Sequence, residues 1–115
     1  MSDSAEAFQM SEKYLKEMLE ADDTANFELY TKRFERRYLE GFTRERFTND
    51  IRHMHERNGM NTGCEFLCTL RSGSLDGVEV LRFAWKGIYE KRDALIDLGI
   101  YKKDGNWYVI NSAVY

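Results

Sequence analysis

The sequence predicts an α+β domain in which three N-terminal helices pack on one face of a curved, antiparallel, four-stranded meander. Helical periodicity is confined to the first half of the chain, and four strand-like segments separated by short turns fill the second half. Helices followed by an uninterrupted run of strands indicate one sheet with the helices on a single side. At 115 residues the chain has room for one domain, residues 1–115, and residues 1–4 are expected to be disordered.

Three amphipathic helices are expected before residue 60. The first covers residues 4–21, and its apolar face consists of Phe8, Leu15, Met18 and Leu19. The second follows the capping cluster Asp22-Asp23-Thr24 and ends near Gly41, with an apolar stripe of Phe27, Tyr30, Phe34 and Tyr38. The third begins after Thr43 as N-cap and ends at Gly59, and it buries Phe47, Ile51 and Met54.

Four strands are expected over residues 64–70, 78–89, 94–102 and 107–115. The Asp104-Gly105 pair predicts a two-residue hairpin between the last two strands. Placing Tyr89 opposite Ala94 and Lys103 opposite Asn106 makes the apolar rows of neighbouring strands agree. The helix-facing row then contains Leu81, Phe83, Trp85, Tyr89, Ile96, Leu98, Ile100, Trp107, Val109, Asn111 and Ala113, and Cys64, Phe66, Cys68 and Leu70 can join it.

The opposite face of this sheet is too apolar to contact only water, which predicts a homodimer through the sheet. The residues expected on the dimer face are Arg82, Lys86, Leu95, Asp97, Tyr101, Tyr108, Ile110 and Ser112. On this register Asp97 lies beside Lys86, flanked by apolar rows. A carboxylate in such a place is a candidate general base, but an ordinary cross-strand pair with Lys86 is favoured.

Composition excludes several classes of function. The net charge of −3 argues against nucleic acid as the main partner, although Lys32, Arg33, Arg36 and Arg37 form a basic patch that we interpret as a solvated helix face. No apolar run approaches the roughly 20 residues of a membrane span, and the acidic N-terminus does not resemble a secretory signal, so a cytoplasmic protein is expected. Cys64 and Cys68 lie roughly 13 Å apart along a strand, beyond disulfide reach, and are expected to be buried, reduced thiols.

A ligand pocket is expected between the helices and the sheet. Asn111 is the one polar residue of its apolar row, Trp85 and Tyr89 would line the same cavity, and His55 lies near the buried face of the third helix. His53 shares a helix side with Asp50 and Arg57 and could be a rim acid or base. A zinc site from His53, His55, Cys64 and Cys68 fails, because the histidines diverge around the helix and the cysteines are too far apart. No catalytic residue, metal or cofactor is assigned.

Four segments resemble the nuclear transport factor 2-like superfamily, a cystatin-like cone fold that includes ketosteroid isomerases, SnoaL-like cyclases and scytalone dehydratases. They are Leu19-Glu20-Ala21-Asp22-Asp23 between two helices, Phe42-Thr43-Arg44-Glu45-Arg46-Phe47 opening the third helix, Asp76-Gly77-Val78-Glu79-Val80 entering a long strand, and Lys103-Asp104-Gly105-Asn106-Trp107-Tyr108-Val109 near the end. The resemblance covers nearly the whole chain. It implies a cone with an internal pocket and a sheet face that commonly forms dimers.

Fold alone does not select a function, because this superfamily includes enzymes, transport adaptors and toxin-neutralising proteins. The favoured hypothesis is a non-catalytic domain that binds a small apolar ligand or dimerises. The first alternative is a protein-binding module such as an immunity protein. The second is an isomerase- or dehydratase-type enzyme, which would need an acid–base residue inside the cone.

Overall fold

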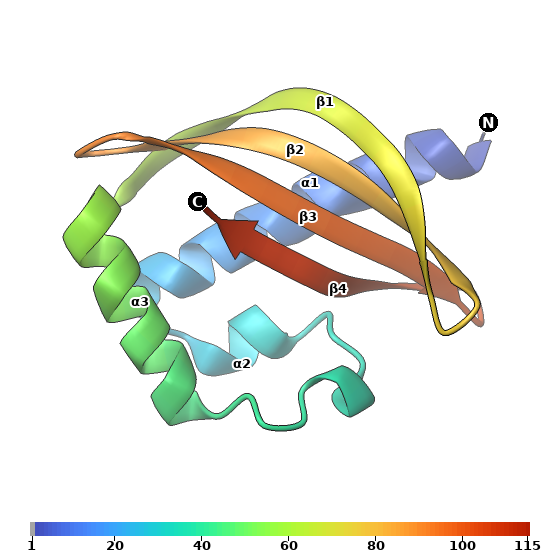
Figure 1. Ribbon diagram of the computed structural model, residues 1–115, viewed down its shortest axis with the longest axis horizontal. Coiled ribbons are helices and arrows are strands. Elements are labelled where there is room, and N and C mark those ends of the chain that lie inside the picture. Colours follow the sequence, from blue (N-terminus) through green and yellow to red (C-terminus); the bar gives the residue numbers. More distant parts are fainter. Residues whose placement is uncertain (1) are drawn as a thin grey trace.

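The chain forms three α-helices and one four-stranded antiparallel sheet, so the α+β prediction is confirmed (Figure 1). The computed structural model describes residues 2–115, with side chains from residue 5 onward. The helices are α1 (Ser2–Thr24), α2 (Phe27–Thr31) and α3 (Arg44–Asn58), and a 3-10 turn covers Arg36–Tyr38. The strands are β1 (Asn61–Leu75), β2 (Val78–Tyr89), β3 (Asp93–Lys103) and β4 (Asn106–Val114), in that order across the sheet.

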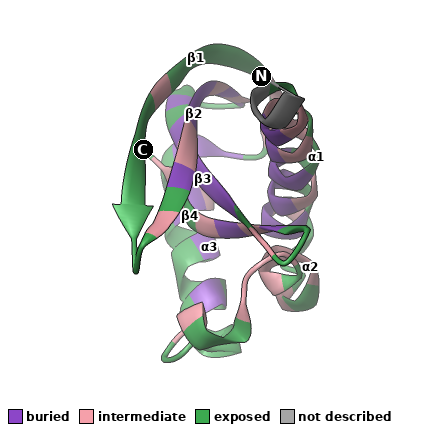
Figure 2. Ribbon diagram, turned by 90° about the vertical axis from the view of Figure 1, so that its right-hand side faces the viewer, coloured by how far each residue is buried: buried purple, intermediate pink, exposed green. Residues whose placement is uncertain are grey.

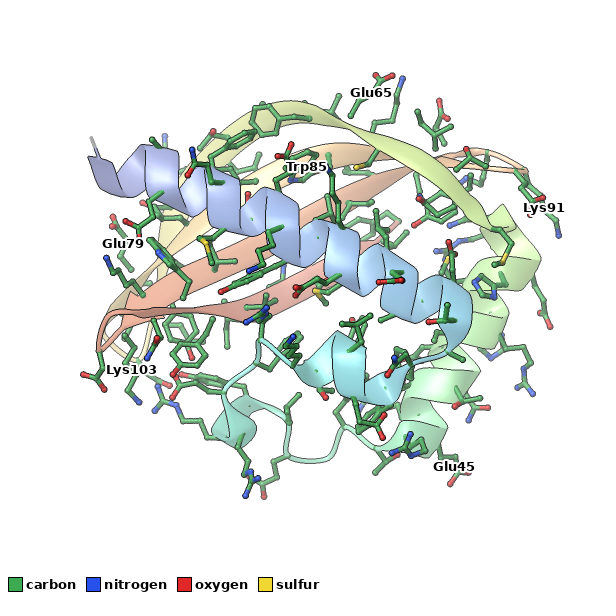
Figure 3. The ribbon with its side chains drawn as sticks, turned by 180° about the vertical axis from the view of Figure 1, so that it is seen from behind. Glu45, Glu65, Glu79, Trp85, Lys91 and Lys103 are labelled. Atoms are coloured by element: carbon green, nitrogen blue, oxygen red, sulfur yellow. The ribbon has the colours of Figure 1, made fainter. Side chains whose placement is uncertain are left out.

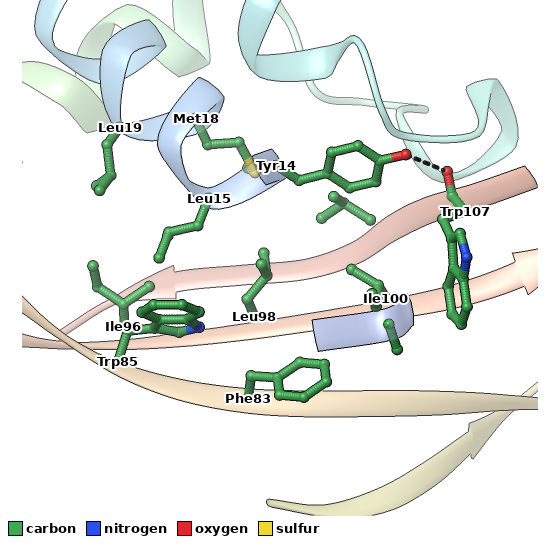
Figure 4. Close-up of a cluster of buried hydrophobic side chains, with 12 residues drawn as sticks. Tyr14, Leu15, Met18, Leu19, Phe83, Trp85, Ile96, Leu98, Ile100 and Trp107 are labelled. Carbon is green, nitrogen blue, oxygen red and sulfur yellow. Dashed lines mark hydrogen bonds between the residues drawn. The ribbon is translucent and has the colours of Figure 1, made fainter. Parts of the chain in front are cut away.

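The main core lies between α1 and the sheet (Figure 4). The buried residues of α1 face the strands, while its outer side is exposed (Figure 2). The α1 side chains Tyr14, Leu15, Met18 and Leu19 pack on a β-sheet surface made by Phe83, Trp85, Ile96, Leu98, Ile100, Trp107 and Val109. The Tyr14 hydroxyl donates to the Trp107 carbonyl at 3.3 Å, which satisfies the polar end of a buried ring.

The two ends of α3 follow from local signals. Thr43 caps α3 by accepting a hydrogen bond from the Arg46 amide at 3.1 Å, and Gly59 ends it with a φ of 79°, as predicted. The start of the chain was expected to be disordered. Met1 lies outside the described residues, and α1 includes residues 2–4. Among the described residues, no helix is both long enough and apolar enough to cross a membrane.

The second predicted helix is wrong beyond Thr31. After α2 the chain runs along the free edge of β4, where Phe34 bridges Val109 in parallel and the Val109 amide donates to the Arg33 carbonyl at 2.8 Å. A continuing helix would leave this edge amide unpaired, so pairing with the strand prevails over helical periodicity. Phe34 and Tyr38, the last two residues of the apolar stripe predicted for this helix, lie on opposite faces of the sheet. Phe34 packs on the main core, whereas Tyr38 contacts Tyr101 on the outer face.

The predicted register between β3 and β4 is correct at their hairpin, where Lys103 pairs with Asn106. The register between β2 and β3 is shifted by two residues, because Ala94 pairs with Gly87 instead of Tyr89. A shift of two keeps every side chain on its predicted face but changes its neighbours. Asp97 therefore lies opposite Ala84 and not opposite Lys86.

Two bulges move residues to the other face of the sheet. The β3–β4 register changes between the Ile100–Val109 and Gly99–Asn111 pairs, so Ile110 is the extra residue. Asn111 and Ala113, predicted to face the helices, consequently face outward, and Ser112 and Val114 face inward. A similar shift at Leu67 turns Cys68 and Leu70 away from the helices, beside Ala84 and Arg82. Cys68 is therefore exposed rather than buried, and both cysteines are free.

A candidate ligand cavity between α3 and β4

A cavity of about 320 Å³ lies where the C-terminal ends of α1 and β4 meet α2 and α3. Figure 1 shows the end of β4 pointing toward α3, with α2 below. We call it the α3 cavity. Its lining consists of Asp22 from α1, Tyr30 from α2, Phe42 before α3, Phe47, Asp50, Ile51, His53, Met54 and Arg57 from α3, and Ser112 and Val114 from β4. The β4 bulge creates this wall, because it turns Ser112 and Val114 inward.

Asp22 is the most unusual residue of the cavity. Only 8% of its surface is exposed, and within the described residues its carboxylate has no hydrogen-bond donor or ion-pair partner. Burial and, to a smaller extent, the negative charge of Asp23 together raise the pKa of Asp22 to about 7. An acidic group in this state exchanges its proton near neutral pH, which is the range in which acid–base and pH-dependent binding sites operate.

Aromatic rings form the wall beside this carboxyl. The ring centroids of Tyr30 and Phe47 are 4.9 Å apart, and those of Tyr30 and Phe42 are 5.7 Å apart. Burial raises the pKa of Tyr30, and the nearby Asp22 charge adds to this effect, so the phenol stays protonated. The cavity therefore combines a flat apolar surface with one desolvated carboxyl, the kind of lining that is typical of small-molecule sites.

The rim of the α3 cavity carries the exposed polar groups Asp50, His53 and Arg57 of α3. Arg57 is already engaged: its Nη2 donates to the Val114 carbonyl at 3.0 Å and its Nε donates to Asn58 Oδ1 at 3.2 Å. The guanidinium thus ties α3 to the end of β4. His53 and Asp50 lie on one side of α3, as the helical spacing predicts.

None of the four residues predicted to form the pocket lines the α3 cavity. Trp85 is 2% exposed and fills the core between α1 and the sheet (Figure 3), and Tyr89 packs against Met54 and Ala94. Asn111 is exposed beside Ile110 because of the bulge. His55 lies close to Asp23, with Nε2 at 3.8 Å from Oδ1, and not on the cavity side of α3. Their role in binding stays a prediction.

The residues predicted for the dimer face divide into two groups. Ser112 lines the α3 cavity, whereas the others belong to the outer face of the sheet. The predicted pair of Lys86 with Asp97 is wrong because of the shifted register. Asp97 Oδ2 accepts from Arg82 Nη2 at 2.9 Å, and Lys86 pairs with Glu65 at 3.2 Å.

Tyr101 is already covered within its own chain. It is 2% exposed, because Glu35 accepts its hydroxyl hydrogen bond and the Tyr38 ring packs against it. Leu95 presents the largest apolar surface of the predicted dimer-face residues, with 47% exposed. Whether this face binds a second copy stays a prediction.

Sequence reasoning missed the two most informative residues of the cavity. Asp22 and Tyr30 were assigned to a capping cluster and to a helical stripe, respectively. A signal for Asp22 was present, because it follows Met18 by four residues and Leu19 by three, which places it on the buried face of α1. A carboxylate that continues an apolar stripe indicates a buried charge, and buried charges without partners concentrate at functional sites.

No protein-family model matches the chain, and no curated protein is significantly similar to it. Among residues 5–115, whose side chains the structure describes, no group of three or more His, Cys, Asp or Glu side chains lies close enough together to hold a metal ion. The α3 cavity is therefore the feature of the molecule that bears on its function.

Proposed function

We propose that this chain is a small-ligand-binding domain of the nuclear transport factor 2-like type, and that its ligand occupies the α3 cavity. The observation that carries the proposal is Asp22, a buried carboxyl without a partner in the described residues, in the lining of a cavity of about 320 Å³. Neither carboxyl oxygen of Asp22 is completely enclosed, so both can be reached from the cavity, and a ligand that donates there would give this carboxyl a partner. The helices against a curved sheet are compatible with the cone architecture.

The lining defines the general chemistry of the ligand. Phe42, Phe47 and Tyr30 offer a flat aromatic surface, and Ile51 and Val114 offer aliphatic contacts. Ser112 and Asp22 provide the polar groups that orient a ligand. A molecule with an apolar ring and one polar end fits this distribution.

The test is an NMR titration of the ¹⁵N-labelled protein with two probes, 2-phenylethylamine and 2-phenylethanol. Ligands of this size reach dissociation constants of about 1 mM in a suitable site. We expect at least one probe to shift the amide signals of α3 and of the end of β4. Shifts scattered over the surface, or no shift at about ten times that concentration, would contradict the proposed function.

Two adjacent β4 residues provide a matched pair of variants. Ser112→Phe places a ring inside the α3 cavity, whereas Ala113→Phe places the same ring on the outer face of the sheet, opposite Asp97. We expect the first variant to lose probe binding and the second to keep it. Equal binding by both variants would place the ligand elsewhere.

A further inference from the structure

We propose that the ligand of the α3 cavity is a small organic cation, an ammonium group on an apolar ring-bearing body, and that Asp22 binds the ammonium. This inference rests on the proposed function and adds the chemical class of the ligand. Its basis is the juxtaposition of a buried carboxylate with no cation of its own, a helix C-terminus and an aromatic wall.

The carboxylate lacks the positive partner that buried acids normally have. The other strongly engaged acids of the chain are paired, as Glu17 is with Arg33 and Glu35 with Lys103. Within the described residues no Lys or Arg side chain forms such a pair with Asp22. A buried charge is stable only when it is paired, so a ligand that brings a positive charge gains more here than a neutral ligand does.

The end of α1 reinforces this preference. Asp22 lies in the last turn of α1, which ends at Thr24. The C-terminal end of a helix carries a partial negative charge, which disfavours the Asp22 carboxylate and attracts a cation. An ammonium beside Asp22 would thus interact favourably with both the side chain and the helix.

The aromatic wall suits the same ligand. Tyr30, whose pKa is raised in part by the nearby Asp22 charge, lines the cavity together with Phe47, and their ring centroids are 4.9 Å apart. A cation over an aromatic face is attracted by the electron-rich face of the ring, and the attraction is stronger when the cation is shielded from water. The apolar body of the ligand can pack on the remaining ring surface of Phe42.

The charges around Asp22 leave the site open to a cation. Arg57 contributes the only permanent positive charge among the cavity residues, and its guanidinium is bonded to the Val114 carbonyl and to Asn58. Asp50 on the rim adds a negative charge. The titratable or charged groups that face Asp22 from the surrounding elements are Asp23, Tyr30, Asp50, His53, Arg57 and Tyr89.

The experiment compares 2-phenylethylamine with its neutral isostere 2-phenylethanol, by the same NMR titration at pH 8 and pH 5.5. The ammonium stays charged over this range, like that of lysine. We expect the amine to bind more tightly than the alcohol at pH 8. Because Asp22 has a pKa of about 7, its ionised fraction falls about 30-fold at pH 5.5, and the amine affinity should fall by up to that factor.

Two variants assign the pH dependence to a residue. Asp22→Asn should remove both the preference for the amine and its pH dependence, while 2-phenylethanol binding shows that the cavity is intact. His53→Gln, which changes the histidine on the rim of the same cavity, should keep both. A pH dependence that disappears in His53→Gln and persists in Asp22→Asn would overturn the assignment.

The outcomes separate this inference from the proposed function. If both probes bind equally at both pH values, or if the alcohol binds more tightly than the amine at pH 5.5, the cavity is a ligand site but the inference that its ligand is a cation is wrong. If neither probe binds, both the function and the inference fail. Selective amine binding that requires Asp22 supports both.

Discussion

Asp22 illustrates how one residue can connect the stability of the fold to its function. Its carboxyl is 8% exposed and holds its proton up to a pH of about 7. Since the pKa of aspartate in an unfolded chain is near 3.8, the folded state binds a proton that the unfolded state has released. The stability that Asp22 contributes is therefore complete below pH 4 and decreases as the pH rises to 7.

The variant Asp22→Asn should consequently be more stable than the wild type at pH 8, because an amide imitates the protonated carboxyl. The shift of the pKa from 3.8 to about 7 sets an upper limit of about 4 kcal/mol on this gain. At pH 4 the two proteins should melt alike. Thermal unfolding of both proteins from pH 4 to pH 8 measures this difference.

A suitable control is Asp50→Asn, which changes an exposed carboxylate on the rim of the same cavity. We expect no comparable gain from it at pH 8. Other carboxylates have lowered pKa values, such as Glu17 beside Arg33. Their contribution to the pH dependence of stability is the same in the wild type and in both variants, so it cancels when the proteins are compared. An Asp22→Asn protein that is no more stable at pH 8 would show that Asp22 is solvated or paired.

The regular elements were predictable where a local signal marks them. Thr43 and Gly59 delimit α3, and the Asp104-Gly105 turn sets the β3–β4 register at Lys103. The bulges at Leu67 and Ile110 have no such signal, because the extra residue is apolar and interrupts no pattern. The α3 cavity depends on the second bulge, so its lining could not be derived from strand alternation alone.

At the scale of a strand, Gly87 leaves the space that the Tyr89 ring of β2 and the Ile96 side chain of β3 occupy. A Cβ atom at this position would lie 2.7 Å from the Tyr89 ring and 2.9 Å from the Ile96 side chain. We expect Gly87→Ala to lower the free energy of unfolding by about 1–3 kcal/mol through overpacking. Gly73→Ala in β1 is the matched control, because nothing lies within 4 Å of its Cβ position. Denaturant unfolding of the two variants checks this, and equal stabilities would contradict the packing described.

On the scale of the whole molecule, α1 covers one face of the sheet. The segment of residues 32–38 covers the edge of β4 and part of the other face. On that outer face Leu95 stays exposed, with 47% of its surface accessible. Exposed apolar sheet surface commonly marks a partner, and a second copy of the chain is the simplest one.

We therefore expect the protein to have twice its chain mass of 13.6 kDa in light scattering, and Leu95→Asp to return it to a monomer. Leu75→Asp is the control. Leu75 is 39% exposed, but it pairs with Val78 at the start of β2, whereas Leu95 pairs with Lys86 near the other end of that strand, so the Leu75 variant should keep the dimer mass. A monomeric wild type, or a dimer that tolerates Leu95→Asp, would contradict this assignment of the outer face.

The probe titration of Ser112→Phe against Ala113→Phe decides whether the α3 cavity is a ligand site. We expect 2-phenylethylamine to shift the α3 amide signals of the wild type and of Ala113→Phe, and to leave those of Ser112→Phe unchanged. Identical responses from the two variants, or no response from the wild type, would contradict it.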